Sequence, residues 1–246
     1  MKKETPSRNI PISILLPQEE MLEVATRKSN LYIGIPTEIS FQENRVALVP
    51  DAVAVLVNNG HRVVVETNAG KASNFSDTDY SEAGAQIAPS PEEVYKAEII
   101  LKISPPSEKE IEMMKPKQIL LSTLHLSTQS DNFIRALMNK RVTAIAYGWI
   151  QDKEGIFPVI RAMGEIAGGA SILIAAEYLN NNNHGKGILL GGISGVPPAK
   201  VVILGAGVVG EFATRTALGL GATVKVFDNS IYKLMRLQNN IGHRVF

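Results

Sequence analysis

Three glycines in the stretch VILGAGVVGEF, residues 202–212, have the spacing Gly-x-Gly-x-x-Gly between a run of Val and Ile and a helical pattern. In a strand–turn–helix, the first glycine permits the tight turn and the second lets the backbone approach a pyrophosphate. The third lets helix and strand pack closely, and the helix N-terminus faces the phosphates. The spacing therefore predicts a dinucleotide site. The residues expected to line it are Gly205, Ala206, Gly207, Val208, Val209 and Gly210.

An acidic residue in the right place supports this prediction. Asp228 ends the next apolar run, 18 residues beyond Gly210. A carboxylate there can accept hydrogen bonds from ribose hydroxyls and would repel a 2′-phosphate, which favours NAD over NADP as the cofactor. The alternative is a glycine turn in another kind of α/β domain.

Three polar side chains in the first half of the chain have the chemistry of a substrate site. Lys102, in EIILKIS, places a charge in an apolar strand. A buried ammonium needs a partner, so Lys102 either binds the substrate or has a structural role. The guanidinium of Arg45 can bind a substrate carboxylate with two hydrogen bonds. Alternatively, Arg45 forms an ion pair with Glu38 or Glu43. His125 ends the apolar strand of LSTLHLS. An imidazole there suits proton transfer near neutrality, or it is a buried, hydrogen-bonded histidine.

The elements that must position these residues alternate between strands and helices from residue 31. We expect strands over 31–35, 61–66, 98–103, 118–122 and 142–147. We expect helices over 51–59, 91–96, 107–114 and 129–140, and a turn with a short helix over 76–84. Asp51 is the expected N-cap of the first helix. This alternation predicts a mostly parallel, doubly wound sheet.

A second unit is expected around the glycine turn. A long helix over 157–179 and a Gly- and Pro-rich segment over 185–200 precede it. Its predicted order is strand 201–204, helix 208–218, strand 223–228 and helix 231–238. A full dinucleotide fold has six strands, so this unit is expected to be incomplete. The predicted class is α/β with two doubly wound Rossmann-like domains. The expected divisions are a tail over 1–30, a substrate and catalytic domain over 31–156, and a linker helix with a truncated NAD-binding domain over 157–246.

Composition excludes several function classes. The chain has 246 residues, 45% hydrophobic and 20% charged, with a formal net charge of +1 and no cysteine. The charge gives no reason to expect a nucleic acid or a charged membrane surface as partner. The lack of cysteine excludes disulfides, a thiol nucleophile and Cys-ligated metals, and we assign no metal ligands. No apolar run is expected to span a bilayer, so the predicted location is cytoplasmic.

The motifs resemble those of a known family. IGIPTEISFQENRVALVP, residues 33–50, resembles the N-terminus of bacterial alanine dehydrogenases, a fold family that includes the NAD-binding subunit of proton-translocating transhydrogenase. The likeness continues through GKGILLGGISGVPPAKVVILGAGVVG and ATVKVFDNSIYKL, and covers about residues 31–246. The histidine of LHLS favours alanine dehydrogenase. So does the lack of the Arg/Gln/Asp loop that the transhydrogenase subunit carries.

The resemblance implies an activity and roles. Alanine dehydrogenases convert L-alanine, NAD and water to pyruvate, ammonium and NADH, and they assemble into hexamers, so a homo-oligomer is expected. By resemblance, Arg45 holds the substrate carboxylate and His125 is the catalytic acid and base. The family's substrate lysine is the second of a Lys-Val-Lys pattern, and Ser104 occupies that position here, after Lys102.

Other positions depart from the family pattern. Gly148 stands where glutamate is expected, and Gly164 where serine is usual near the cofactor. In the family, a catalytic aspartate, the remaining Rossmann strands and a returning C-terminal segment lie beyond the position of residue 246. The alternative function is therefore a non-catalytic NAD(H)-binding module, such as a partner subunit like the transhydrogenase alpha subunit, or an inactive fragment.

Overall fold

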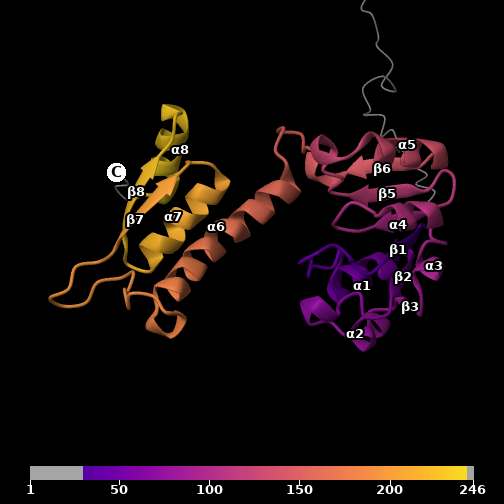
Figure 1. Ribbon diagram of the computed structural model, residues 1–246, viewed down its shortest axis with the longest axis horizontal. Coiled ribbons are helices and arrows are strands. Elements are labelled where there is room, and N and C mark those ends of the chain that lie inside the picture. Colours follow the sequence, from indigo (N-terminus) through magenta and orange to yellow (C-terminus); the bar gives the residue numbers. More distant parts are fainter. Residues whose placement is uncertain (1–29, 243–246) are drawn as a thin grey trace, which may run out of the picture.

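The computed structural model describes residues 30–242, so the tail expected over 1–30 lies outside the described residues apart from Asn30. The chain forms two parallel sheets with helices around them (Figure 1). The strands are β1 Tyr32–Ile35, β2 Arg62–Glu66, β3 Gln86–Ala88, β4 Ile99–Leu101, β5 Ile119–Ser122, β6 Thr143–Ala146, β7 Lys200–Leu204 and β8 Thr223–Phe227. The α-helices are α1 Pro50–Asn58, α2 Asp77–Glu82, α3 Pro91–Val94, α4 Glu108–Met113, α5 Asp131–Lys140, α6 Pro158–Leu179, α7 Val208–Gly219 and α8 Ile231–Ile241.

The first sheet has the strand order β3-β2-β1-β4-β5-β6, and every pairing in it is parallel. The order reverses between β1 and β4, and ligands bind at the carboxyl ends of strands at such a point. All five expected strands are present, each shortened by one to three residues. The short strand β3 was not expected from the sequence.

Helices cover both faces of this sheet, which confirms the doubly wound arrangement. On one face, Val53 of α1 and Tyr80 of α2 pack in a buried cluster with residues of β1 and β2. On the other face, Ile111 of α4 and Phe133 of α5 pack against β4 and β5. Both faces are covered at the central strands, so β1, β4 and β5 read as short continuous apolar runs, as expected for a parallel sheet. The edge strand β6 is mostly exposed.

The expected N-cap of α1 is wrong. Asp51 lies inside the first turn of α1, and the N-cap is Val49, which makes no side-chain capping bond. Pro50 takes the first helical position because its fixed φ suits a helix start and its missing N–H has no partner there in any helix. Asp51 remains favourable in the first turn, where the helix dipole attracts negative charge.

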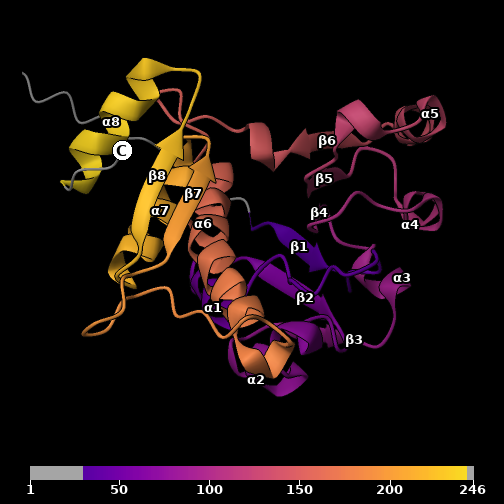
Figure 2. The same ribbon diagram turned by 60° about the vertical axis from the view of Figure 1, so that its left-hand side comes forward.

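The second sheet contains β7 and β8 in parallel register, joined through α7 and followed by α8. Residues on one face of it, including Val224 and Val226, form a buried cluster with α7 and Leu237 of α8. In both views α6 lies between the two sheets (Figures 1 and 2). It packs along α7 with Gly168 at the close approach, where a Cβ would lie 2.4 Å from the Val209 carbonyl oxygen.

The helix α6 differs from expectation in one respect. A stretch of 18 residues within its 22 has a mean hydropathy of 1.5, so by length and composition the helix could cross a membrane, and only 11% of that stretch is buried. It also carries an ion pair between Arg161 and Glu165, with Nε and Oε1 3.0 Å apart, and it packs along α7. One side of this apolar helix therefore packs against α7 within the chain.

Candidate functional site

The carboxyl ends of β1, β4, β5 and β6 bring together the residues that the sequence singled out. Because these strands are parallel, the loops that follow them lie at one edge of the sheet. The loop after β1 carries Arg45, β4 leads into Lys102 and Ser104, and β5 leads into His125. The 3₁₀ turn that contains Gly148, Tyr147–Trp149, follows β6.

Arg45 is engaged with a carboxylate of its own loop. Its Nε and Nη2 donate to Oε1 and Oε2 of Glu43 at 2.7 and 2.6 Å, and this hydrogen bonding holds the pKa of Glu43 below its usual range. The Arg45 side chain is 56% exposed and that of Glu43 is 12% exposed. Ser104 Oγ lies 3.5 Å from Glu43 Oε2. The guanidinium of Arg45 thus binds a carboxylate in the geometry that a substrate would need, and the ion pair considered as an alternative is formed with Glu43.

Lys102 finds its partners inside the protein. Its side chain is fully buried, and Nζ lies 2.6 Å from Glu110 Oε1 and 3.7 Å from Glu38 Oε2. The Tyr95 hydroxyl donates to Glu110 Oε1 at 3.0 Å. The role of Lys102 as a substrate ligand stays a prediction. Within the protein, two carboxylates already neutralise its ammonium.

Glu110 and Glu38 were not predicted from the sequence as partners of Lys102. Glu110 is the third residue of a capping box with Ser107, a pattern visible in the sequence. Glu38 accepts hydrogen bonds from the backbone N–H groups of Ile103 and Ser104. Burial raises the pKa of Glu38, and the ammonium of Lys102 and these N–H donors lower it only in part. The sequence signal for these two partners was the lysine in an apolar strand, because a buried ammonium needs acidic side chains beside it.

His125 lies on a turn held in an uncommon backbone conformation. Both Leu124 and His125 have positive φ, 53° and 44°, in the left-handed region that a residue with a Cβ seldom adopts. Side chains from either side hold the turn. Ser122 Oγ accepts the Leu124 N–H at 3.1 Å, and Gln129 Nε2 donates to the Leu124 carbonyl at 3.0 Å. Such conformations persist where surrounding contacts impose them and are common at functional sites.

The imidazole of His125 is exposed and faces a pocket. The alternative of a buried histidine is therefore wrong, and the described residues offer its side chain no hydrogen bond. The pocket has a volume of about 480 Å³ and is lined by Thr123, His125, Leu126, Ser127, Gly148, Trp149, Phe157 and Ile160. Phe157 is the N-cap of α6 and Ile160 lies in its first turn, so the start of this helix forms one wall of the pocket beside the histidine. A Cβ on Gly148 would lie 3.2 Å from Ile160 Cδ1.

The glycine turn has the geometry that the spacing predicts. Gly205 has a φ of +110°, and a Cβ on Gly205 or Gly207 would meet nothing within 4 Å. A Cβ on Gly210 would lie 1.9 Å from the Gly205 carbonyl oxygen, so only glycine fits there. Gly207 is the N-cap of α7 and has no side-chain capping bond. The turn therefore leaves open space before an uncapped helix N-terminus, which fits the pyrophosphate of a dinucleotide.

Asp228 is tied to this turn. Its Oδ2 accepts the Ala206 N–H at 2.7 Å and its Oδ1 accepts the Ser230 N–H at 2.8 Å, and these bonds lower the pKa of Asp228. Each oxygen of an ionised carboxylate has a further lone pair, so both can still accept from a ribose hydroxyl. The residues present therefore fit a nucleotide with a free 2′-hydroxyl.

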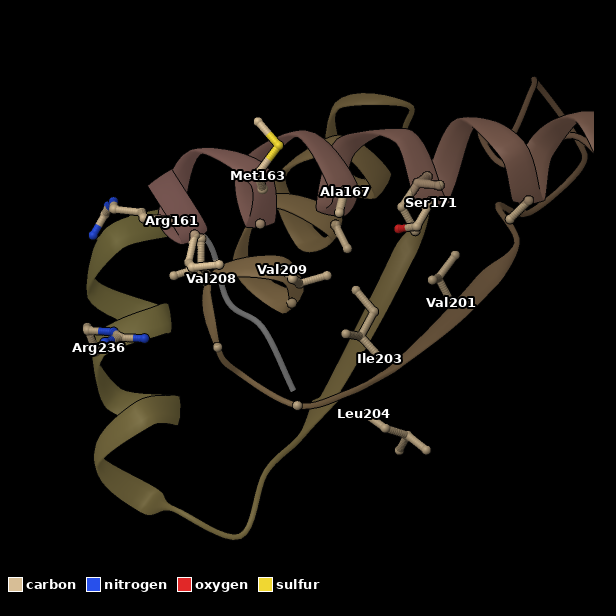
Figure 3. Close-up of a pocket in the computed structure, with 18 of the residues that line it drawn as sticks. Arg161, Met163, Ala167, Ser171, Val201, Ile203, Leu204, Val208, Val209 and Arg236 are labelled. Carbon is tan, nitrogen blue, oxygen red and sulfur yellow. The ribbon is translucent and has the colours of Figure 1, made fainter. Parts of the chain in front are cut away.

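A larger pocket of about 1040 Å³ adjoins the turn between α6 and β7 (Figure 3). The glycine turn, β7 and the apolar side of α6 line it, and its charged side chains are Arg161 and Arg236. Phe157 and Ile160 line both this pocket and the histidine pocket, and Met163 Sδ lies 3.6 Å from Arg45 Nη1. The first half of α6 therefore contacts the arginine, the histidine pocket and the glycine turn together.

The fold and these sites define a two-unit α/β protein of the dinucleotide-binding class. The chain belongs to the alanine dehydrogenase/PNT family. The family model for the N-terminal domain matches residues 34–167, and the model for the C-terminal domain matches residues 171–246.

Individual relatives agree with the family. Alanine dehydrogenase 2 of Staphylococcus aureus and the alanine dehydrogenase of Staphylococcus epidermidis are each 43% identical over 213 residues. That alignment covers 87% of this chain and 57% of each relative, so the chain spans little more than half their length. A solved L-alanine dehydrogenase has a TM-score of 0.80 and 42% identity, with 87% of this chain and 59% of that chain covered. The transhydrogenase from Sinorhizobium meliloti has a TM-score of 0.75 and 26% identity, with 87% and 60% covered.

Proposed function

We propose that the chain is the substrate-binding and NAD-binding part of an NAD-dependent alanine dehydrogenase, which converts L-alanine and water to pyruvate and ammonium and runs in reverse. The observation that carries this proposal is the convergence of three sites on the first half of α6. Arg45, the His125 pocket and the glycine turn all contact it. Substrate and cofactor must meet for a hydride to move between them, and this convergence provides the place.

The roles follow from the geometry of the chain. A bound nicotinamide supplies the hydride acceptor. Arg45 exchanges Glu43 for the substrate carboxylate, which has the same planar, two-oxygen shape. Ser104 lies close enough to donate a hydrogen bond to that carboxylate. His125, exposed at its pocket, gives and takes the proton at the carbonyl oxygen as the C–N bond breaks.

NAD is the proposed cofactor because Asp228 is ionised at the ribose end of the turn. An anion there repels a 2′-phosphate and accepts from a 2′-hydroxyl. We place the domain boundary at residues 156 and 157, just before α6, with the substrate and catalytic domain before it and the NAD-binding domain after it. This boundary separates the two sheets and their separate buried clusters.

A homo-oligomer in the cytoplasm completes the proposal. Large apolar side chains of α6 that line neither pocket remain exposed, namely Ile166, Leu173, Ile174 and Tyr178. An exposed apolar stripe of this kind marks a surface that another subunit covers. For the cytoplasmic location, the support is the Arg161–Glu165 ion pair on α6 and the packing of this helix along α7.

The experiment is an NADH absorbance assay with the 246-residue chain, pyruvate and ammonium. We expect absorbance to fall with pyruvate, to fall less with other 2-oxo acids, and not to fall without ammonium. The matched variant is His125→Ala, which should bind NADH as the wild type does but give no turnover. Turnover by His125→Ala at the wild-type rate would contradict the catalytic role.

The second candidate is a non-catalytic NAD(H)-binding module. It is favoured by Gly148 and Gly164, which lack the polar side chains of the family pattern, and by Ser104, which lacks the charge of the family's lysine. A flat absorbance trace from a chain that binds NADH would support this candidate. A chain that does not bind NADH would contradict both.

A further inference from the structure

Arg236 on α8 points toward the glycine turn (Figure 3). Its Nη2 lies 3.4 Å from the Ala206 carbonyl oxygen, and its side chain lines the large pocket together with Gly205 and Gly207. The side chain is otherwise exposed. A guanidinium in this position stands beside the space that the two glycines leave open.

Arg236 forms no ion pair with an acidic side chain of the described residues. By contrast, Arg161, the other cation of the pocket, is paired with Glu165. Glu211 in the first turn of α7 is held by Arg215 at 2.8 Å and by Asn240 at 3.2 Å. Burial raises the pKa of Glu211 and, after the larger effects of Arg215 and Asn240, the charge of Arg236 helps to lower it, but Arg236 and Glu211 form no ion pair. Arg236 is therefore a cation available to an anion at the turn.

The position of Arg236 favours one part of a dinucleotide over the others. The large pocket includes the turn and the first residues of α7, where the helix dipole attracts phosphate, but Asp228 does not line it. Arg236 therefore faces the phosphate side of the turn and not the ribose side. A guanidinium binds phosphate oxygens with two parallel hydrogen bonds, which no other residue lining this pocket offers except the paired Arg161.

We propose that Arg236 binds the pyrophosphate of the dinucleotide, together with the N-terminus of α7. The inference rests on the proposed NAD site and adds to it a residue from the helix after the acidic strand end. Arg236 contributes binding by charge and by direct hydrogen bonds, so its effect should be confined to ligands that carry phosphate.

The test compares Arg236→Gln, Arg236→Lys and Arg135→Gln with the wild type. Arg135 lies exposed on α5 in the first unit, so its replacement removes the same charge elsewhere. Dissociation constants are measured by calorimetry for NADH, ADP-ribose and NADPH, and by ligand-observed NMR for adenosine. Thermal unfolding of each variant checks the fold.

We expect Arg236→Gln to weaken NADH and ADP-ribose by about tenfold and to leave adenosine unchanged, with a smaller loss in Arg236→Lys. Arg135→Gln should match the wild type. Unchanged NADH binding in Arg236→Gln overturns the inference but leaves the NAD site standing. An equal loss for adenosine, or a loss confined to NADPH, also overturns it, since Arg236 would then act on the base or on a 2′-phosphate. A wild-type chain that binds neither NADH nor ADP-ribose overturns the NAD site and this inference together.

Discussion

At the scale of single residues, the buried cluster of Lys102, Glu38 and Glu110 sets the character of the first site. Burial raises the pKa of Glu110, but the ammonium of Lys102 and the hydrogen bonds from Ser107 together lower it by more. The net pKa therefore lies below the usual value. The pKa of Glu38 lies above the usual value because burial outweighs its partners. Two acids share one ammonium, and the more closely paired acid keeps its charge more firmly.

Replacing Lys102 by Met should destabilise the chain strongly. The substitution leaves two buried carboxylates without their cation, which costs about 3–5 kcal/mol when one partner of a buried pair is removed. Urea unfolding followed by circular dichroism measures the loss. The double variant Lys102→Met with Glu110→Gln should recover part of it, because it removes one of the stranded charges. A loss below about 1 kcal/mol in Lys102→Met would show that the cluster is not electrostatically coupled.

Replacing Glu110 by Gln should change how stability depends on pH. The pKa of Glu110 in the folded chain is below its ordinary value of 4.5, so its contribution is fully present above about pH 4.5. It is lost as the pH falls through the folded pKa, where the wild-type side chain becomes neutral like glutamine. The difference in unfolding free energy between wild type and Glu110→Gln should therefore be largest near pH 7 and shrink below pH 4.5. A difference that stays constant down to pH 3 would contradict this account.

At the scale of elements, the sequence predicts most of the fold because its strands are short apolar runs between polar or glycine-rich segments. The helix ends were less accurate, since Val49 and not Asp51 caps α1. The strand β3 was missed because its three residues, QIA, give no period to read. The left-handed turn at Leu124 and His125 was not predicted, because the side chains of Ser122 and Gln129 hold it against the backbone preference of these two residues.

The close packing of α6 on α7 gives a prediction for neighbouring glycines. A Cβ on Gly168 would lie 2.4 Å from the Val209 carbonyl oxygen and 2.8 Å from Phe212 Cβ, whereas a Cβ on Gly169 meets only Thr216 Oγ1 at 3.6 Å. Gly168→Ala should therefore cost about 1–3 kcal/mol by forcing the helices apart. Gly169→Ala should be neutral or stabilising by up to about 1 kcal/mol, because alanine favours the helix.

Thermal unfolding measures both glycine variants, and proteolysis of the α6–α7 unit gives a second readout. Because each variant adds one methyl group to the same helix, the pair separates packing from helix propensity. If both variants shift the unfolding midpoint by the same amount and in the same direction, the close approach at Gly168 is not tight in solution.

At the scale of the whole molecule, the candidate site is partly local and partly the product of long-range packing. The glycine turn and Asp228 lie within one strand–turn–helix–strand segment, so their spacing alone predicted their geometry. The contact of α6 with Arg45 joins residues 118 positions apart, Arg45 and Met163, and α6 reaches the pocket of His125 through Phe157 and Ile160. No local pattern indicates such contacts, and the same holds for Arg236 at the glycine turn.

The second sheet gives the last prediction, because one of its faces is open. Val201, Ile203, Val224 and Val226 pack toward α7 and α8, while Val202, Leu204 and Phe227 are exposed on the opposite face, Leu204 at 83%. Parallel sheets are normally covered on both faces. Apolar surface left open on a two-stranded sheet favours contact with another copy of the chain. We therefore expect the 246-residue chain to self-associate through this face as its concentration rises.

Leu204→Lys should reduce this association, because it places a charge at the most exposed apolar position of the face. The matched control is Met138→Lys, which changes a side chain 69% exposed on α5 in the first unit and should leave association unchanged. Sedimentation velocity over a range of concentrations measures both variants. An oligomer formed through α6 would persist in Leu204→Lys with a fixed stoichiometry, whereas association through the open sheet would weaken and lose its concentration dependence. If Leu204→Lys and Met138→Lys sediment alike, the open face does not drive association, and α6 is left as the surface that another subunit covers.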